Sequence, residues 1–133
     1  MTTTLHIRLL GGFSLVYGET PVAALNSDRL QSFLVYLLLH RQAPQPRQHL
    51  AFLLWPDSME NQARGNLRNL LHQVRRGLPD AAQFIEMEGQ TLLWKADAPF
   101  TLDVDEFQRG ITLFIAHHGD LAVELIRKRI VID

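Results

Sequence analysis

Side chains that could recognise a nucleic acid are concentrated in the stretch from Ser58 to Leu78, SMENQARGNLRNLLHQVRRGL. At about 100° per residue, an α-helix over this stretch places one polar set within an arc of roughly 80°. That set is Asn61, Arg64, Arg68, His72 and Arg75, and Asn69 and Arg76 extend it. Arginine can fork onto guanine, asparagine can fork onto adenine, and either can reach a phosphate. The arc therefore suits a DNA major groove, although a helix face that is simply solvated has the same composition.

The residues on the opposite side of the same stretch predict how the helix packs on the rest of the protein. An apolar stripe with helical spacing runs along it: Ala63, Leu67, Leu70, Leu71, Val74 and Leu78. Such a stripe indicates one long amphipathic helix over residues 58–78 whose apolar face packs on a core.

Catalytic and metal-binding chemistry has little support in the sequence. The chain has no cysteine, which excludes thiolate metal sites and disulfides. The pairs His117–His118 and His40/His49 lack a further His, Asp or Glu at metal-site spacing, and a pair of loop histidines is usually only solvated. No serine or carboxylate pair stands in a recognisable catalytic frame. We expect a protein that is not an enzyme, with no metal and no cofactor.

Charge is unevenly distributed along the 133 residues. The formal net charge is only −1, which gives no general argument for nucleic-acid binding. Yet the segment from residue 29 to 76 contains seven arginines against two acids, whereas residues 80–106 contain seven acids against Lys95. A local basic patch is therefore compatible with a near-neutral total.

The apolar runs are short. The longest, Phe33 to Leu39, is too short to cross a bilayer, and the N-terminus lacks the features of a signal peptide. We expect no membrane association and a cytoplasmic location.

The N-terminal third predicts a small antiparallel sheet followed by a buried helix. Short β-prone runs occur at Leu5–Leu10, Phe13–Tyr17 and Val22–Leu25, separated by glycine-containing turns. Asn26, Ser27 and Asp28 are candidate N-caps, and Asp28 with Gln31 resembles a capping box. The helix expected over residues 29–41 is apolar on nearly all sides and ends with His40 and Arg41 in its last turn.

A second helix is expected over residues 47–55, with Pro46 as its first residue. Arg47 and Gln48 then lie in its first turn, where free backbone N–H groups favour an anion such as a phosphate. It should bury Leu50, Leu53 and Leu54 and end at Trp55-Pro56. Asp57, as N-cap with Glu60, would open the long helix, and two helices joined this closely are typical of a helix-turn-helix.

The segment after Leu78 predicts a β-hairpin, in which Gly89-Gln90 forms the turn between Ile85–Glu88 and the strand containing Leu92 and Trp94. A hairpin placed after a recognition helix is the wing of a winged helix, and Gln90 and Thr91 at its tip are the candidate phosphate contacts. A further strand is expected within 100–104 and a helix from Asp103, capped with Glu106. Residues 120–132 fit either a helix or a strand.

The order of these elements resembles the OmpR/PhoB-type winged-helix domains, and more specifically the N-terminal DNA-binding domain of SARP-type bacterial transcriptional activators. The resemblance covers about Leu5 to Phe107. Its residues are LHIRLLGGFSLVYGETPV, RLQSFLVYLLLHR, RQHLAFLLWPD, ARGNLRNLLHQVRRGLP and DVDEF. The most specific part is the LWP that closes one helix, followed closely by the AR-x-N-L-R helix.

The resemblance implies an α+β winged-helix fold and sequence-specific promoter binding by a transcription regulator. Residues 1–103 would form the DNA-binding domain, and residues 104–133 would be a helical extension, shorter than the activator domain of that family. The expected base contacts are Asn61, Arg64, Arg68, Asn69 and His72. The expected phosphate contacts are Arg47, Gln48, Arg75, Arg76, Gln90 and Thr91.

The expected partners are double-stranded promoter DNA, a second copy of the chain on direct-repeat sites, and RNA polymerase. The resemblance implies that the polymerase is contacted by the loop Trp55, Pro56, Asp57 and Ser58. An alternative remains open, because a winged helix can also serve as a protein–protein contact module without specific DNA binding. The near-neutral charge and the acidic hairpin, with Glu86 and Glu88, are the features that favour this alternative.

Overall fold

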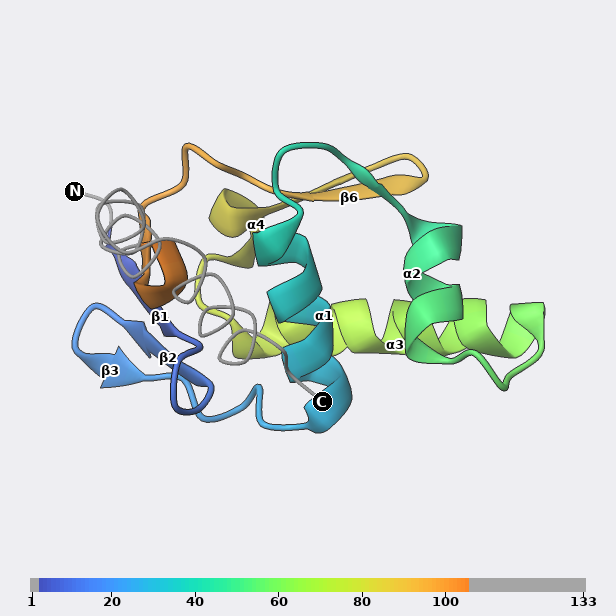
Figure 1. Cartoon of the computed structure of the whole chain (residues 1–133), viewed down its shortest axis with the longest axis horizontal. Helices are drawn as coiled ribbons and strands as arrows, with labels where there is room; N and C mark the ends of the chain where they lie inside the picture. Colours follow the sequence, from blue (N-terminus) through green and yellow to red (C-terminus); the bar gives the residue numbers. More distant parts are fainter. Residues whose placement is uncertain (1–2, 106–133) are drawn as a thin grey trace, which may run out of the picture. The chain divides into compact units, whose positions relative to one another are not determined.

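The computed structural model describes residues 3–105, which form an α+β arrangement (Figure 1). The chain divides into two compact units. One is the continuous segment from residue 22 to 98, and the other is built from the segments on either side of it. None of the helices in the described part of the chain is long and apolar enough to cross a membrane. The helix predicted from Asp103 is described only over residues 103–105, which are helical. The rest of it and the ambiguous segment 120–132 lie outside the described residues.

The flanking segments form a four-stranded sheet in the order β3-β2-β1-β7. Its strands are β1 (Leu5–Arg8), β2 (Ser14–Tyr17), β3 (Thr20–Pro21) and β7 (Phe100–Leu102). Leu5 and Ile7 are buried while His6 and Arg8 are exposed, which confirms the predicted alternation along β1. The sheet is not purely antiparallel, because β7 pairs with β1 in parallel.

One strand prediction and one turn prediction near residues 18–25 are wrong. The run Val22–Leu25 is not a strand, and the third strand lies instead at Thr20–Pro21, where we expected a turn. Pro21 is tolerated there because β3 is at the edge of the sheet. Leu25, although not in a strand, is buried.

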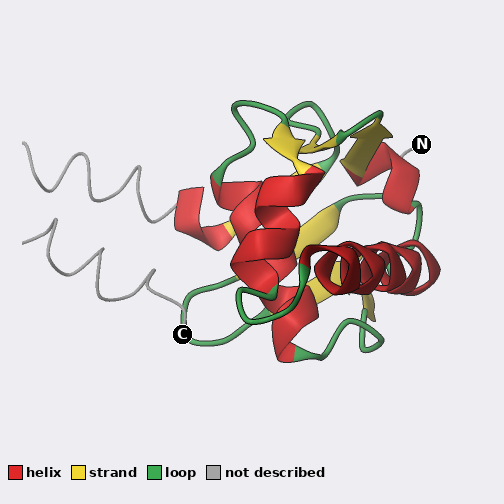
Figure 2. Cartoon of the chain, turned by 90° about the vertical axis from the view of Figure 1, so that its right-hand side faces the viewer, coloured by secondary structure: helices red, strands yellow, loops and turns green. Residues whose placement is uncertain are grey.

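The segment 22–98 is built around three helices, α1 (Asp28–Leu39), α2 (Arg47–Leu54) and α3 (Glu60–Gly77). Six of the twelve residues of α1 are buried, all of them apolar, as its sequence predicts. In α2 the buried residues are Leu50 and Ala51, whereas Leu53 is 43% exposed and Leu54 is half-buried, so the prediction that both leucines are buried is wrong. Figure 1 shows α2 lying across the first half of α3, and Figure 2 shows α3 along its axis.

The long helix carries its predicted apolar stripe. Ala63, Leu67, Leu70, Leu71 and Val74 are all buried, and Leu78 is buried just after the last turn. The helix begins two residues later than predicted. Ser58 N–H donates to Trp55 O in a turn, so that Met59, not Asp57, is the N-cap residue, without a side-chain cap hydrogen bond.

The other predicted helix ends also need correction. Ser27 caps α1, with its Oγ accepting from the Leu30 N–H at 3.2 Å, so the Asp28–Gln31 capping box does not form. His40 and Arg41 lie beyond the last turn of α1. Arg41 still serves the expected purpose, because its Nη1 donates to Leu38 O at the end of the helix.

The predicted hairpin is confirmed as β5 (Ile85–Glu88) and β6 (Thr91–Trp94), paired antiparallel with Glu88 opposite Thr91. Gly89 has a φ of 59°, which suits the first position of a two-residue turn. Two elements were not predicted: the single helical turn α4 (Ala81–Phe84) and the short strand β4 (Gln45–Pro46). Pro46 therefore precedes α2 as its N-cap residue and is not its first helical residue.

Candidate nucleic-acid interface

The polar arc of α3 is solvent-exposed along the whole helix. Every member of the predicted set is exposed: Asn61, Arg64, Arg68, Asn69, His72, Arg75 and Arg76. The stripe on the other side of the helix is buried, so these side chains are held on a fixed support. With its side chains an α-helix is about 10–12 Å in diameter, which fits the width of a DNA major groove of about 12 Å.

The first residue of α2 is fixed next to the turn of the hairpin. β4 pairs with β6, placing Pro46 opposite Thr91, and Arg47 N–H donates to Gln90 O at 2.8 Å. This N–H is consequently not free for an anion, contrary to our expectation for the first turn of α2. The pairing nevertheless fixes the backbone from which the Arg47 side chain extends. Arg47 Nε is buried and has no hydrogen-bond partner among the described residues.

Three elements converge on one cavity of about 470 Å³, which we call the basic groove. It is lined by α2 and the residue before it, by α3 and by the hairpin turn: Pro46, Arg47, Gln48, Arg64, Leu67, Arg68 and Gln90. Three of these side chains are arginines, and none of them is acidic. Five of the eleven predicted DNA contacts, which are far apart in sequence, therefore lie around a single concave surface.

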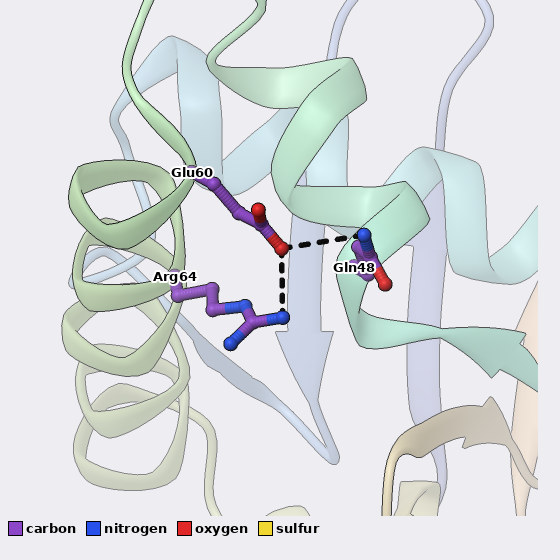
Figure 3. A network of polar contacts seen from close by, with 3 residues as sticks. All are labelled: Gln48, Glu60 and Arg64. Carbon is purple, nitrogen blue, oxygen red and sulfur yellow. Dashed lines mark hydrogen bonds and ion pairs between the residues drawn. The ribbon is translucent and has the colours of Figure 1, made fainter.

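A carboxylate lies beside two of these groove residues (Figure 3). Glu60 Oε1 accepts from Arg64 Nη2 at 2.8 Å and from Gln48 Nε2 at 3.3 Å. The ion pair is solvent-accessible, with the two side chains 55% and 60% exposed, so that it adds little to the stability of the free chain.

The remaining predicted contacts lie outside the basic groove. Asn61, Asn69, His72 and Arg76 are exposed on α3 but do not line it. Arg75 Nη2 donates to the sulfur of Met87, and Arg75 lines a separate hollow together with Asp80, Glu86 and Lys95. Thr91 Oγ1 donates to Glu88 O within the hairpin turn.

The loop between α2 and α3 borders a second cavity, of about 230 Å³. Trp55, Pro56 and Ser58 line it, and Asp57 does not. Large apolar side chains are exposed on both sides of the loop: Phe52 is 65% exposed and Met59 is 83% exposed. Trp55 is half-buried, with the Arg29 guanidinium 5.2 Å from its ring centroid, whereas Trp94 is fully buried beside Phe84, as expected of a core residue.

The two histidines considered as metal ligands, His40 and His49, both contact Tyr36. His40 stacks on the ring of Tyr36, and His49 Nε2 hydrogen-bonds Tyr36 Oη at 3.2 Å, which joins α1 to α2. Within residues 3–105 no three side chains of the metal-binding types come together. His117 and His118 lie outside the described residues.

Two features of the interface were missed in the sequence. Glu60 was assigned only to helix capping, and the pairing of Gln45–Pro46 with β6 was not foreseen. The spacing of Glu60 and Arg64 by four residues was a usable signal for their ion pair. Nothing in the local sequence indicated that Gln48 would reach the same carboxylate.

Comparison of the sequence with models of protein families and with curated proteins gives no match.

Proposed function

We propose that the protein is a sequence-specific DNA-binding transcription regulator of winged-helix type, with α3 as the recognition helix and the β5–β6 hairpin as the wing. The observation that carries the proposal is the basic groove, where arginines from two elements meet beside the turn of a third. A DNA backbone that follows this groove would bring α3 against the base edges. The Arg47 guanidinium lines the same groove and adds a positive charge that would attract the phosphates.

The residues divide into two roles. Arg64 and Arg68, near the start of α3, are the proposed base contacts together with Asn61, because the N-terminal part of a recognition helix enters the groove deepest. Asn69 and His72 extend the same exposed face. Arg47, Gln48 and Gln90 are the proposed phosphate contacts of the groove, with Arg75, Arg76 and Thr91 further along.

The proposal predicts that Arg68→Ala weakens binding to the preferred DNA site. Sites are first selected from a random pool of duplexes at two salt concentrations. Loss of a bidentate base contact should then cost about 1–3 kcal/mol of discrimination at that site. The fold should survive, because the Arg68 side chain is exposed. Arg29→Ala is the charge-matched control, since Arg29 lies on α1 and does not line the groove.

Two results would contradict the proposal: recovery of no enriched sequence, or equal site affinity in Arg68→Ala and wild type. Enrichment of paired half-sites in direct repeat would support binding by two copies of the chain. Half-sites present only singly would count against the expectation that two copies of the chain bind one site.

A second candidate function is a winged-helix module for protein–protein contact. The observation that favours it is the exposure of Phe52, Leu53 and Met59 around the α2–α3 loop, since clustered apolar surface marks interaction sites. A regulator could use both surfaces, with the loop contacting RNA polymerase. DNA affinity that falls steeply with added salt, as counterion release requires, discriminates in favour of the first function.

A further inference from the structure

Glu60 is an acidic residue beside the basic groove, and a groove that serves only to attract phosphate would not need a negative charge there. Figure 3 shows the Glu60 carboxylate between the side chains of Arg64 and Gln48, and one oxygen accepts from both. Arg64 and Gln48 line the basic groove and also the cavity behind the α2–α3 loop, whereas Glu60 lines only the latter. The carboxylate thus holds two groove residues from outside the groove.

A purely structural role accounts for part of this arrangement. Glu60 is in the first turn of α3, where a negative charge complements the helix dipole, and its ion pair with Arg64 has the favourable i, i+4 order. Neither effect requires Gln48, which comes from α2 and lies twelve residues earlier. The contact with Gln48 shows that the carboxylate is turned toward the groove residues of both helices.

The arrangement has two opposing consequences for a bound duplex. A negative charge close to phosphates is repelled, so Glu60 lowers the affinity for DNA of any sequence. The same carboxylate fixes the direction of the Arg64 guanidinium through one of its five N–H donors and leaves the others available to a base edge. A guanidinium with a fixed direction loses less side-chain freedom on binding and tolerates a wrong base less well.

Taking the proposed DNA-binding function as given, we propose that Glu60 is a specificity-determining residue that positions Arg64 for a base contact and lowers affinity for non-cognate DNA. It is a positioning residue and not a base contact itself. In the free chain the exposed Glu60–Arg64 ion pair needs to be formed only part of the time. When DNA is bound it excludes water from around the ion pair, and the attraction between Glu60 and Arg64 becomes stronger.

The test compares full-length Glu60→Gln and Glu60→Ala with the wild type on two duplexes, the site selected by the wild type and a scrambled sequence of the same composition. Both variants should bind the scrambled duplex more tightly, by about fivefold, as expected for removing one charge at contact distance in water. The affinity ratio, which is the affinity for the selected site divided by that for the scrambled duplex, should fall by at least about fivefold. A fall of this size is within the discrimination that a single bidentate base contact supplies.

Asp28→Asn is the matched control. Asp28 is an exposed carboxylate in the first turn of α1, as Glu60 is in the first turn of α3, and it lines neither of the two cavities. The substitution removes the same charge without touching Arg64 or Gln48, so the affinity ratio should stay at the wild-type value. An equal fall in the ratio for Asp28→Asn and Glu60→Gln would overturn the proposal.

A double-mutant cycle with Arg64→Ala tests whether Glu60 acts through Arg64. In the Arg64→Ala background, Glu60→Gln should no longer change the affinity ratio, because the guanidinium that it positions is gone. An undiminished effect in that background would overturn the positioning role. Thermal unfolding of each variant shows whether stability has changed, and a structural role alone would alter stability without altering the ratio.

The two proposals fail in different ways. If the wild type shows neither salt-dependent binding nor an enriched site, the proposed function is wrong and this inference falls with it. If the wild type selects a site and Glu60→Gln keeps the wild-type affinity ratio, only the inference about Glu60 is wrong.

Discussion

The backbone and the side chain of Arg47 have separate roles in the interface. Its N–H is used by Gln90 O, which fixes the start of α2 against the hairpin turn. Its guanidinium lines the basic groove, and Nε is buried without a hydrogen-bond partner among the described residues. The unsatisfied Nε costs free energy in the free chain, whereas the charge of the guanidinium at the groove is what would attract a phosphate.

We therefore predict that Arg47→Ala weakens DNA binding almost equally for every sequence. The slope of log affinity against log salt should become shallower by about 0.9, the value for one phosphate contact. Stability should not fall much, because the backbone hydrogen bond to Gln90 remains and the unsatisfied donor is removed. Binding titrations at four or five salt concentrations measure the slope, and a loss confined to the selected site would instead identify Arg47 as a base contact.

At the scale of elements, the two glycines of α3 show how packing changes the effect of one substitution. A Cβ added at Gly65 has no atom within 4 Å, whereas a Cβ at Gly77 would lie 2.7 Å from Leu25 Cδ2 and 3.1 Å from Ala24 Cβ. Leu25 is buried and has little room to move.

We predict opposite effects of the same replacement at these two positions. Gly65→Ala should raise the free energy of unfolding by about 0.5–1 kcal/mol, from helix propensity. Gly77→Ala should lower it by about 1 kcal/mol, because overpacking exceeds the small propensity gain at a helix end. Urea denaturation of both variants measures the difference, and equal stabilisation by both would show that the contact with Leu25 yields easily.

At the scale of the whole molecule, each compact unit has its own hydrogen-bonded sheet. The unit of flanking segments is closed by a contact across 94 residues, because Asp103 Oδ1 accepts from Leu9 N–H at 2.8 Å and Oδ2 accepts from Leu10 N–H at 3.0 Å. Parallel pairing of β1 with β7 joins the same two segments.

Asp103→Ala should consequently destabilise this unit, by about 2 kcal/mol for the loss of charge-assisted hydrogen bonds. In native-state hydrogen exchange, the amides of β1 should lose protection while those of Leu71 and Val74 in α3 keep theirs. Equal loss in both places would show that the two units unfold together.

The sequence alone determined the features that depend on neighbouring residues. The spacing of Leu67, Leu70 and Leu71 predicted which face of α3 is buried and which is exposed. Gly89-Gln90 predicted the hairpin turn, because a two-residue loop needs a residue that accepts a positive φ. The same local periodicity predicted that the arginines of α3 would share an exposed face. Most of the candidate base contacts were chosen because they lie on that face.

Only the tertiary structure decided how distant segments meet. Propensity carries no information about partners 40 or 90 residues away, so the β4–β6 and β1–β7 pairings were not foreseen. The α3 N-terminus was also misplaced, because the Trp55–Ser58 turn removed Asp57 from the capping position. The basic groove and the Glu60 contact with Gln48 exist because α2 packs across α3 beside the hairpin turn, and packing of this kind is set by the shapes of whole elements.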